Sequence, residues 1–63
     1  MFIVLEKAIN GFIIRLVTHN GIFSFVYKTA RSCKKCIEWL QKLNARVIKS
    51  SSDLYLQILL EVN

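Results

Sequence analysis

Two Asn-Gly pairs, Asn10-Gly11 and Asn20-Gly21, lie ten residues apart, and each is flanked by apolar segments. An Asn-Gly pair readily adopts the two successive positive-φ conformations of a type I′ turn, which joins neighbouring antiparallel strands through a two-residue loop. This spacing predicts a three-stranded antiparallel meander. The strands are expected over about 2–9, 12–19 and 22–28.

Two-residue loops would also set the register of the meander. Leu5 would lie opposite Leu16, and Thr18 opposite Phe23. Glu6 would lie directly opposite Arg15, and such an opposite-charge pair stabilises a sheet by roughly 0.2–1 kcal/mol. One face of the sheet is then the expected core face, and it carries Ile3, Leu5, Phe12, Ile14, Leu16, Phe23, Phe25 and Tyr27.

The other face of the predicted sheet is more apolar than a solvated face should be. Its polar members are Glu6, Arg15 and Ser24, and its apolar members are Val4, Ile13, Val17, Ile22 and Val26. The chain is 54% hydrophobic and only 21% charged, so it has more apolar surface than one small core can bury. We expect these apolar residues to form a partner or dimer interface.

Apolar residues recur at intervals of three and four between residues 30 and 44, which predicts an amphipathic helix with Thr29 or Ser32 as its N-cap. The apolar stripe of this helix comprises Cys33, Cys36, Ile37, Leu40 and Leu43. We expect it to pack on the core face of the sheet.

The last third of the chain offers two further elements. Residues 46–49 form a short strand candidate. Residues 54–62 alternate in hydrophobicity, which favours a strand, while a helix opened by Ser52 and Asp53 is the alternative because Leu, Gln and Glu form helices well. The sequence thus predicts a single α+β domain over 1–63: an antiparallel three-stranded meander, one helix packed on one face, and a C-terminal strand or hairpin.

The helix begins with a C-x-x-C pair, Cys33 and Cys36, beside two lysines. A helix N-terminus and nearby lysines would lower a thiol pKa, as in a thiol redox protein. A glutaredoxin-like site also needs a cis-proline, and this chain has no proline. Because both cysteines lie on the core stripe, we interpret them as free structural residues, with redox activity as an alternative.

No metal or other cofactor is expected, because His19 is the only further candidate ligand for a zinc site at the two cysteines. Catalysis is not expected either. Four acidic residues and one histidine offer no convincing acid-base pair and no nucleophile with an adjacent base.

The whole chain has a net charge of +5, and most of its basic residues lie between residues 28 and 49. The proposed partner-binding basic face comprises Arg31, Lys34, Lys35, Lys42 and Arg46. Such a face fits an anionic partner, including nucleic acid, or simply a solvated helix surface. It lacks the interleaved aromatic residues on which bases stack. Trp39, beside it, is expected at the flank of the core or as a partner anchor.

No apolar run reaches the roughly 18 uncharged residues of a membrane-spanning helix, and the N-terminal residues lack the pattern of a secretory signal. We therefore expect a cytoplasmic protein that does not enter the membrane. Its most plausible role is that of a small protein-binding inhibitor or adaptor, of the type found in phages and mobile elements, acting as a homodimer. A nucleic-acid-binding protein is the first alternative, and a C-x-x-C redox protein is the second.

The stretch R-L-V-T-H-N-G over residues 15–21, followed by Y-K-T at 27–29 and I-E-W-L at 37–40, resembles the small bacterial YegP-like family. The repeat unit of that family carries R-L, N-G, Y-K-S and I-E-x-V in this order. The resemblance covers residues 2–44 and implies three strands and a helix that pair with another copy of the unit. It transfers no functional residues.

Overall fold

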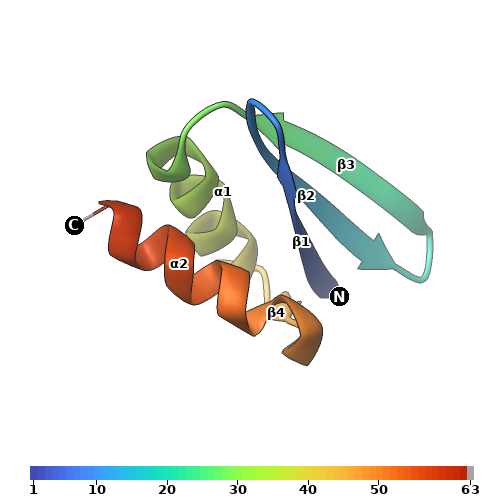
Figure 1. The fold of residues 1–63 in the computed structure, drawn as a ribbon. Helices are drawn as coiled ribbons and strands as arrows, with labels where there is room; N and C mark the ends of the chain where they lie inside the picture. The colour runs from blue at the N-terminus through green and yellow to red at the C-terminus, as the bar shows by residue number, and fades with distance from the viewer. Residues whose placement is uncertain (63) are drawn as a thin grey trace.

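The computed structural model describes residues 1–62 and has one four-stranded sheet with two helices packed on one face (Figure 1). Its strands are β1 (Phe2–Ala8), β2 (Gly11–Thr18), β3 (Gly21–Tyr27) and β4 (Arg46–Val47). Its helices are α1 (Ala30–Lys42) and α2 (Ser52–Val62), with the 3-10 turn η1 (Lys49–Ser51) before α2. The sheet order is β3-β2-β1-β4. The α+β class and the three-stranded antiparallel meander are confirmed.

Both hairpins differ from their predicted register by two residues. Leu5 pairs with Ile14, and Leu16 pairs with both Ile3 and Phe23. The two-residue loops are residues 9–10 and 19–20, so each glycine is the first residue after its loop. A shift of two residues returns every side chain to the same face, so the predicted core and outer faces are correct although the pairings were wrong.

The type I′ turns are absent from the described residues, since no loop residue has a positive φ. The glycines serve other purposes. Gly21 has a φ of 138° directly after its loop, in a region that residues with a side chain rarely adopt. Gly11 has no positive φ, but a Cβ there would collide with the backbone oxygen of Tyr27. The two glycines therefore shape the start of each return strand rather than the tip of the turn.

One hydrophobic core lies between the helices and strands β1 and β2. Ile3, Ile14 and Ile37 are completely buried in it, and Ile58 adds a contact from α2. The third strand contributes less: Phe25 and Tyr27 are half-buried, and Phe23 is 51% exposed. Phe23 lies on the predicted face, but it belongs to an edge strand that the helices cover only in part.

Helix α1 begins where the sequence predicts. The Thr29 hydroxyl caps it by accepting a hydrogen bond from the Ser32 amide at 3.2 Å. It ends two residues early, because Asn44 takes a left-handed conformation with a φ of 69° and the Ala45 amide donates back to the Leu40 carbonyl at 3.1 Å. This closure resembles the common left-handed end of a helix. It leaves Leu43, expected on the core stripe, exposed at the C-cap.

The strand predicted over residues 54–62 is wrong, because this segment is the helix α2. Its burial follows a helical period. The one fully buried residue, Ile58, lies four residues from Leu54 and from Val62, which are half-buried, whereas Leu56 and Leu60 of the alternating pattern are exposed. Two apolar patterns overlap in this segment, and the helical pattern prevails because α2 packs on α1 and on β1.

The short strand predicted near residue 46 is confirmed as β4. It pairs in parallel with β1 through Phe2↔Arg46 and Ile3↔Val47. A parallel neighbour needs a crossover connection, which the chain makes through β2, β3 and α1. Beyond β4, the Ile48 amide still donates to the Ile3 carbonyl at 3.1 Å. The segment after α1 therefore returns along the free edge of β1.

Candidate functional site

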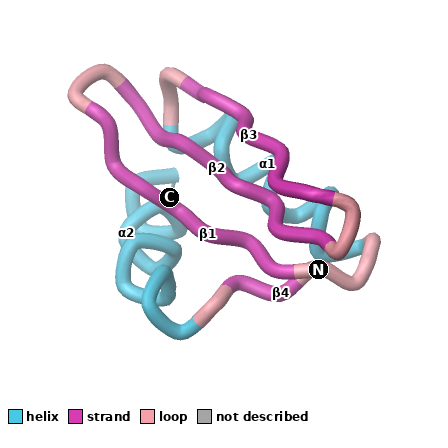
Figure 2. Tube along the Cα trace, turned by 90° about the vertical axis from the view of Figure 1, so that its right-hand side faces the viewer, coloured by secondary structure: helices cyan, strands magenta, loops and turns pink. Residues whose placement is uncertain are grey.

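The first candidate surface is the face of the sheet that points away from both helices, which we call the outer face. Figure 2 shows the sheet in front of α1 and α2, so no described element covers it. Side chains from three strands form rows across it. One row contains Phe2, Val17 and Ile22, and another contains Glu6, Ile13 and Val26.

The five predicted interface residues all lie on the outer face. Ile22 and Val26 are 65% and 72% exposed, whereas Val4, Ile13 and Val17 are half-buried by their neighbours in the sheet. Phe2, which was not among the predicted interface residues, is also exposed on this face and pairs with Val17. Its alternation with Val4 and Glu6 along β1 was the signal that could have placed it there.

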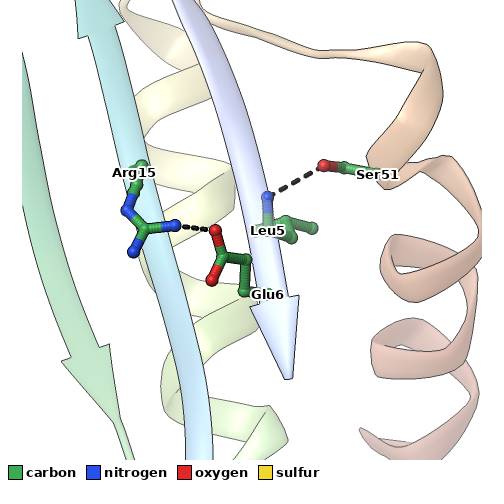
Figure 3. A network of polar contacts seen from close by, with 4 residues as sticks. All are labelled: Leu5, Glu6, Arg15 and Ser51. Atoms are coloured by element: carbon green, nitrogen blue, oxygen red, sulfur yellow. Dashed lines mark hydrogen bonds and ion pairs between the residues drawn. The ribbon is translucent and has the colours of Figure 1, made fainter. Parts of the chain in front are cut away.

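The charged residues of the outer face are paired with each other. Arg15 and Glu6 form an ion pair (Figure 3). Arg15 lies opposite Val4, so its contact with Glu6 is diagonal and not the direct pairing that was predicted. The ion pair leaves this face electrically neutral in a chain whose net charge is +5.

The second candidate surface is a groove of about 420 Å³ between β3 and α1, which we call the β3–α1 groove. Phe25 and Tyr27 line it from the strand. The helix contributes residues spaced three and four apart, which place them on one side of α1; these are Ser32, Lys35, Cys36 and Trp39. Its walls are therefore mainly aromatic, with an ammonium group and a hydroxyl among them.

The two edges of the sheet differ. At the β1 edge, the backbone pairs with β4, and the Leu5 amide then donates to the buried Ser51 hydroxyl at 2.9 Å (Figure 3). At the other edge, β3 pairs only with β2 within the described residues. Alternate backbone groups along a strand at a sheet edge point outward without a partner strand. This open edge borders the β3–α1 groove.

The two cysteines occupy different environments. Cys33 is completely buried in the core, as predicted, and burial raises its pKa to about 11, with a further increase from the nearby Cys36. A thiol with a raised pKa is protonated at neutral pH and is a poor nucleophile. Cys36 is half-buried at the groove, where a hydrogen bond with its side chain, together with burial, raises the pKa of Tyr27 to about 12. This environment opposes a reactive thiolate at Cys33.

The predicted basic face is divided by the fold. Arg31, Lys35 and Lys42 are exposed and lie four and seven residues apart, so they share the solvent side of α1. Lys34 is half-buried and lies two helical turns before Gln41, whose amide donates to the Tyr55 hydroxyl of α2 at 3.4 Å. Arg46 lies on β4, at the opposite edge of the sheet from β3.

The remaining predictions concern His19, Trp39 and metal binding. His19, the further candidate zinc ligand, is exposed in the second hairpin loop, one residue beyond β2. Trp39 is 59% exposed, so it is a wall of the groove rather than a flank of the core. Within residues 1–62, no three histidine, cysteine, aspartate or glutamate side chains gather at a place that could hold a metal ion. Neither described helix is long and apolar enough to cross a membrane.

Comparisons of the chain with protein-family models, curated proteins and solved structures find no match. The resemblance to the YegP-like family therefore stays a prediction. After its three strands and first helix, this chain continues into β4 and α2.

Proposed function

We propose that this chain is a non-catalytic protein-binding protein of the small inhibitor or adaptor type, and that a second copy of the chain docks on its outer face. The observation that carries this proposal is the exposure of Ile22 and Val26 on the mainly apolar outer face, which no described element covers. Contiguous exposed apolar patches on small proteins commonly mark interaction sites. An inhibitor or adaptor acts by occupying a surface, so it needs no catalytic group.

The charge of the outer face favours a second copy as its occupant. Because Glu6 and Arg15 neutralise each other, two outer faces can meet without bringing excess positive charge together. A two-fold axis would also allow Arg15 of each chain to approach Glu6 of the other. The basic side chains of α1 lie behind the sheet and would stay on the distant sides of such a dimer, where screening over about 8 Å weakens repulsion.

The size of the outer face limits the affinity that we expect for the dimer. Three strands of seven to eight residues span about 23 Å by 14 Å, from the rise of a strand and the spacing between strands. Such a face is small for a stable protein interface, which buries about 800 Å² on each partner. We therefore expect dimers with a dissociation constant in the micromolar range.

Sedimentation equilibrium between about 1 and 500 μM tests the proposal, since this range brackets micromolar affinity. The double variant Ile22→Thr/Val26→Thr should sediment as a monomer, because it removes apolar area but keeps β-branched side chains that suit a strand. The matched control is Ile9→Thr, which changes an isoleucine that is 98% exposed in the first hairpin loop. The control should dimerise like the original chain.

A chain that is monomeric at 500 μM would overturn the dimer. Dimers of unchanged affinity in the double variant would equally overturn the outer face as their interface. In either case, the protein-binding class would have to rest on another surface.

Nucleic-acid binding is the second candidate, and the observation that favours it is the exposed basic line Arg31, Lys35 and Lys42 along α1. We expect the protein-binding function to prevail, since Glu38 interrupts this line and Trp39 is the one exposed aromatic residue of α1 beside it, whereas nucleic-acid bases stack on several interleaved aromatic side chains. If the partner were DNA or RNA, affinity would fall log-linearly with salt concentration because bound phosphates release counterions.

The discriminating measurement is oligonucleotide binding at 0.15 M salt. Submicromolar binding that disappears on charge reversal of Lys34, Lys35 and Lys42 would replace the protein-binding proposal. Retention at low salt alone is expected of any chain with a net charge of +5 and decides nothing.

A further inference from the structure

The geometry points to a second docking site, formed by the open edge of β3 together with the β3–α1 groove, that captures an extended acidic peptide segment of another protein. We infer that the peptide adds to the sheet as a strand beside β3, inserts an aromatic or large aliphatic side chain against Trp39, and places a carboxylate near Lys35. This inference rests on the protein-binding class proposed above but uses a different surface.

The backbone of β3 is open to an incoming strand along one side within the described residues. β3 is seven residues long and at the end of the sheet, where strand addition supplies main-chain hydrogen bonds to an incoming peptide. Proteins usually protect such an edge with a charge, a proline or a covering segment. Residues 21–27 read G-I-F-S-F-V-Y and contain neither a charge nor a proline.

The β3–α1 groove offers a place for side chains of the added strand. Every second residue of a strand points to the same side of the sheet. Those on the helix side would lie next to Phe23, Phe25 and Tyr27, which point to that side from β3. They would also lie close to the exposed side chain of Trp39. The groove volume of about 420 Å³ is enough for large side chains.

The positive charge around the groove favours an acidic occupant. Lys35 lines the groove, Lys28 directly follows β3, and Arg31 and Lys42 lie on the adjoining side of α1, against a single acid, Glu38. A second copy of this chain at the same edge would add four more basic residues to this region. An acidic peptide would instead be attracted by it, and the carboxylate near Lys35 would gain a charge-assisted hydrogen bond.

The required spacing defines a probe. Groove-facing residues of the peptide must stand two apart, while its other side chains face the outer side of the sheet. We suggest an acetylated and amidated heptapeptide with threonine at its odd positions, and with phenylalanine, glutamate and aspartate at its even positions. Threonine favours an extended strand and keeps the peptide soluble.

The experiment measures fluorescence anisotropy of the heptapeptide carrying fluorescein in place of its acetyl group, with the fluorescence change of Trp39, the single tryptophan of the chain, on addition of the acetylated peptide as a second signal. Lys35→Glu should weaken binding about tenfold through lost charge pairing. Lys42→Glu makes the same charge change on the same helix without touching the groove, and it should weaken binding by less than about twofold, as screening of exposed charges predicts. Trp39→Ala should weaken it more than about fivefold, as for an interface anchor.

Three results would overturn the inference: no saturable binding at millimolar peptide, equal losses in Lys35→Glu and Lys42→Glu, or equal binding of a peptide with proline at its central position, which breaks the strand. The outer-face variant Phe2→Thr changes an exposed residue on β1, which β2 separates from β3, and it should bind the heptapeptide normally. Sedimentation of the same samples reports the dimer separately, so failure of the groove and failure of the outer face can be distinguished.

Discussion

The two edges of the sheet are built differently although both belong to the same small meander. The β1 edge is closed by β4, by the Ile48 amide and by the Ser51 hydroxyl, all of which come from the segment after α1. The β3 edge is open along seven residues and lies beside an apolar groove. The segment of about 20 residues after α1 thus closes one edge and completes the core, while no element of residues 1–62 pairs with the other edge.

The two edges also differ in how the polar groups of their backbones find hydrogen-bond partners. At the closed edge, the buried Leu5 amide would have no hydrogen-bond partner without the Ser51 hydroxyl, which accepts its hydrogen bond. At the open edge, the backbone is solvated, so it needs no internal partner in the free protein. An open, uncharged strand beside exposed aromatic side chains is a liability for a protein that acts alone, but it suits one that receives another chain.

The largest expected effect comes from removing the anchor of the closing segment. Ile58 is the fully buried residue of α2, and Ile58→Ala should lower the free energy of unfolding by about 2–5 kcal/mol, from lost burial and a cavity. The matched change Leu60→Ala, at a residue that is 76% exposed, should cost less than about 0.5 kcal/mol. Urea denaturation measures both. Equal losses would mean that α2 does not close the core as described.

The next effect concerns the polar contact at the closed edge. Ser51→Ala removes the acceptor of the Leu5 amide and should destabilise the protein by about 1–3 kcal/mol, because a buried donor loses its partner. Hydrogen exchange at the Leu5 amide should accelerate in parallel. The exposed neighbour Ser50 provides the control, since Ser50→Ala should change neither quantity. A stable Ser51→Ala variant with a protected Leu5 amide would show that β1 finds another partner.

A smaller effect is the pH dependence of stability, which separates the contribution of Cys33 in the core from that of Tyr27 at the groove. The folded pKa of Cys33 is about 11, against 9.0 for an ordinary thiol. Unfolded chains therefore release this proton first, and the stability it contributes is fully present below pH 9 and declines as pH rises toward 11. Tyr27, raised from 10.0 to about 12, adds a decline at higher pH.

Cys33→Ala should flatten the first part of this decline while leaving the part due to Tyr27. Replacing both cysteines with alanine should cost roughly 1–2 kcal/mol at pH 7, from lost buried volume, and serine should cost more. Denaturation curves between pH 7 and 11 test both statements. A native thiol that titrates below pH 7 and alkylates rapidly would restore the redox alternative.

The sequence predicts the meander, the faces of its strands and the start of α1 because these follow from local patterns: alternation, loop residues and the Thr29 cap. It does not predict the register, since each glycine serves the start of a strand and not the loop itself. It fails for residues 54–62, where the choice between two apolar periods depends on packing against α1. The groove was out of reach because Trp39 and Phe25 become neighbours only when α1 folds back beside β3.

The smallest effect tests the register of the open edge itself. Ser24 lies directly opposite Arg15 in the structure, whereas the register predicted from two Asn-Gly loops would place it opposite Val17. A glutamate at this position should therefore attract Arg15 and a lysine should repel it, so that Ser24→Glu exceeds Ser24→Lys in stability by roughly 0.2–1 kcal/mol. Both side chains are solvated, so the difference should shrink in 1 M salt. Thermal unfolding of the two variants at low and high salt measures it. A difference that is absent at low salt would place Ser24 away from Arg15, and the rows of the outer face would then have to be redrawn along with the edge beside them.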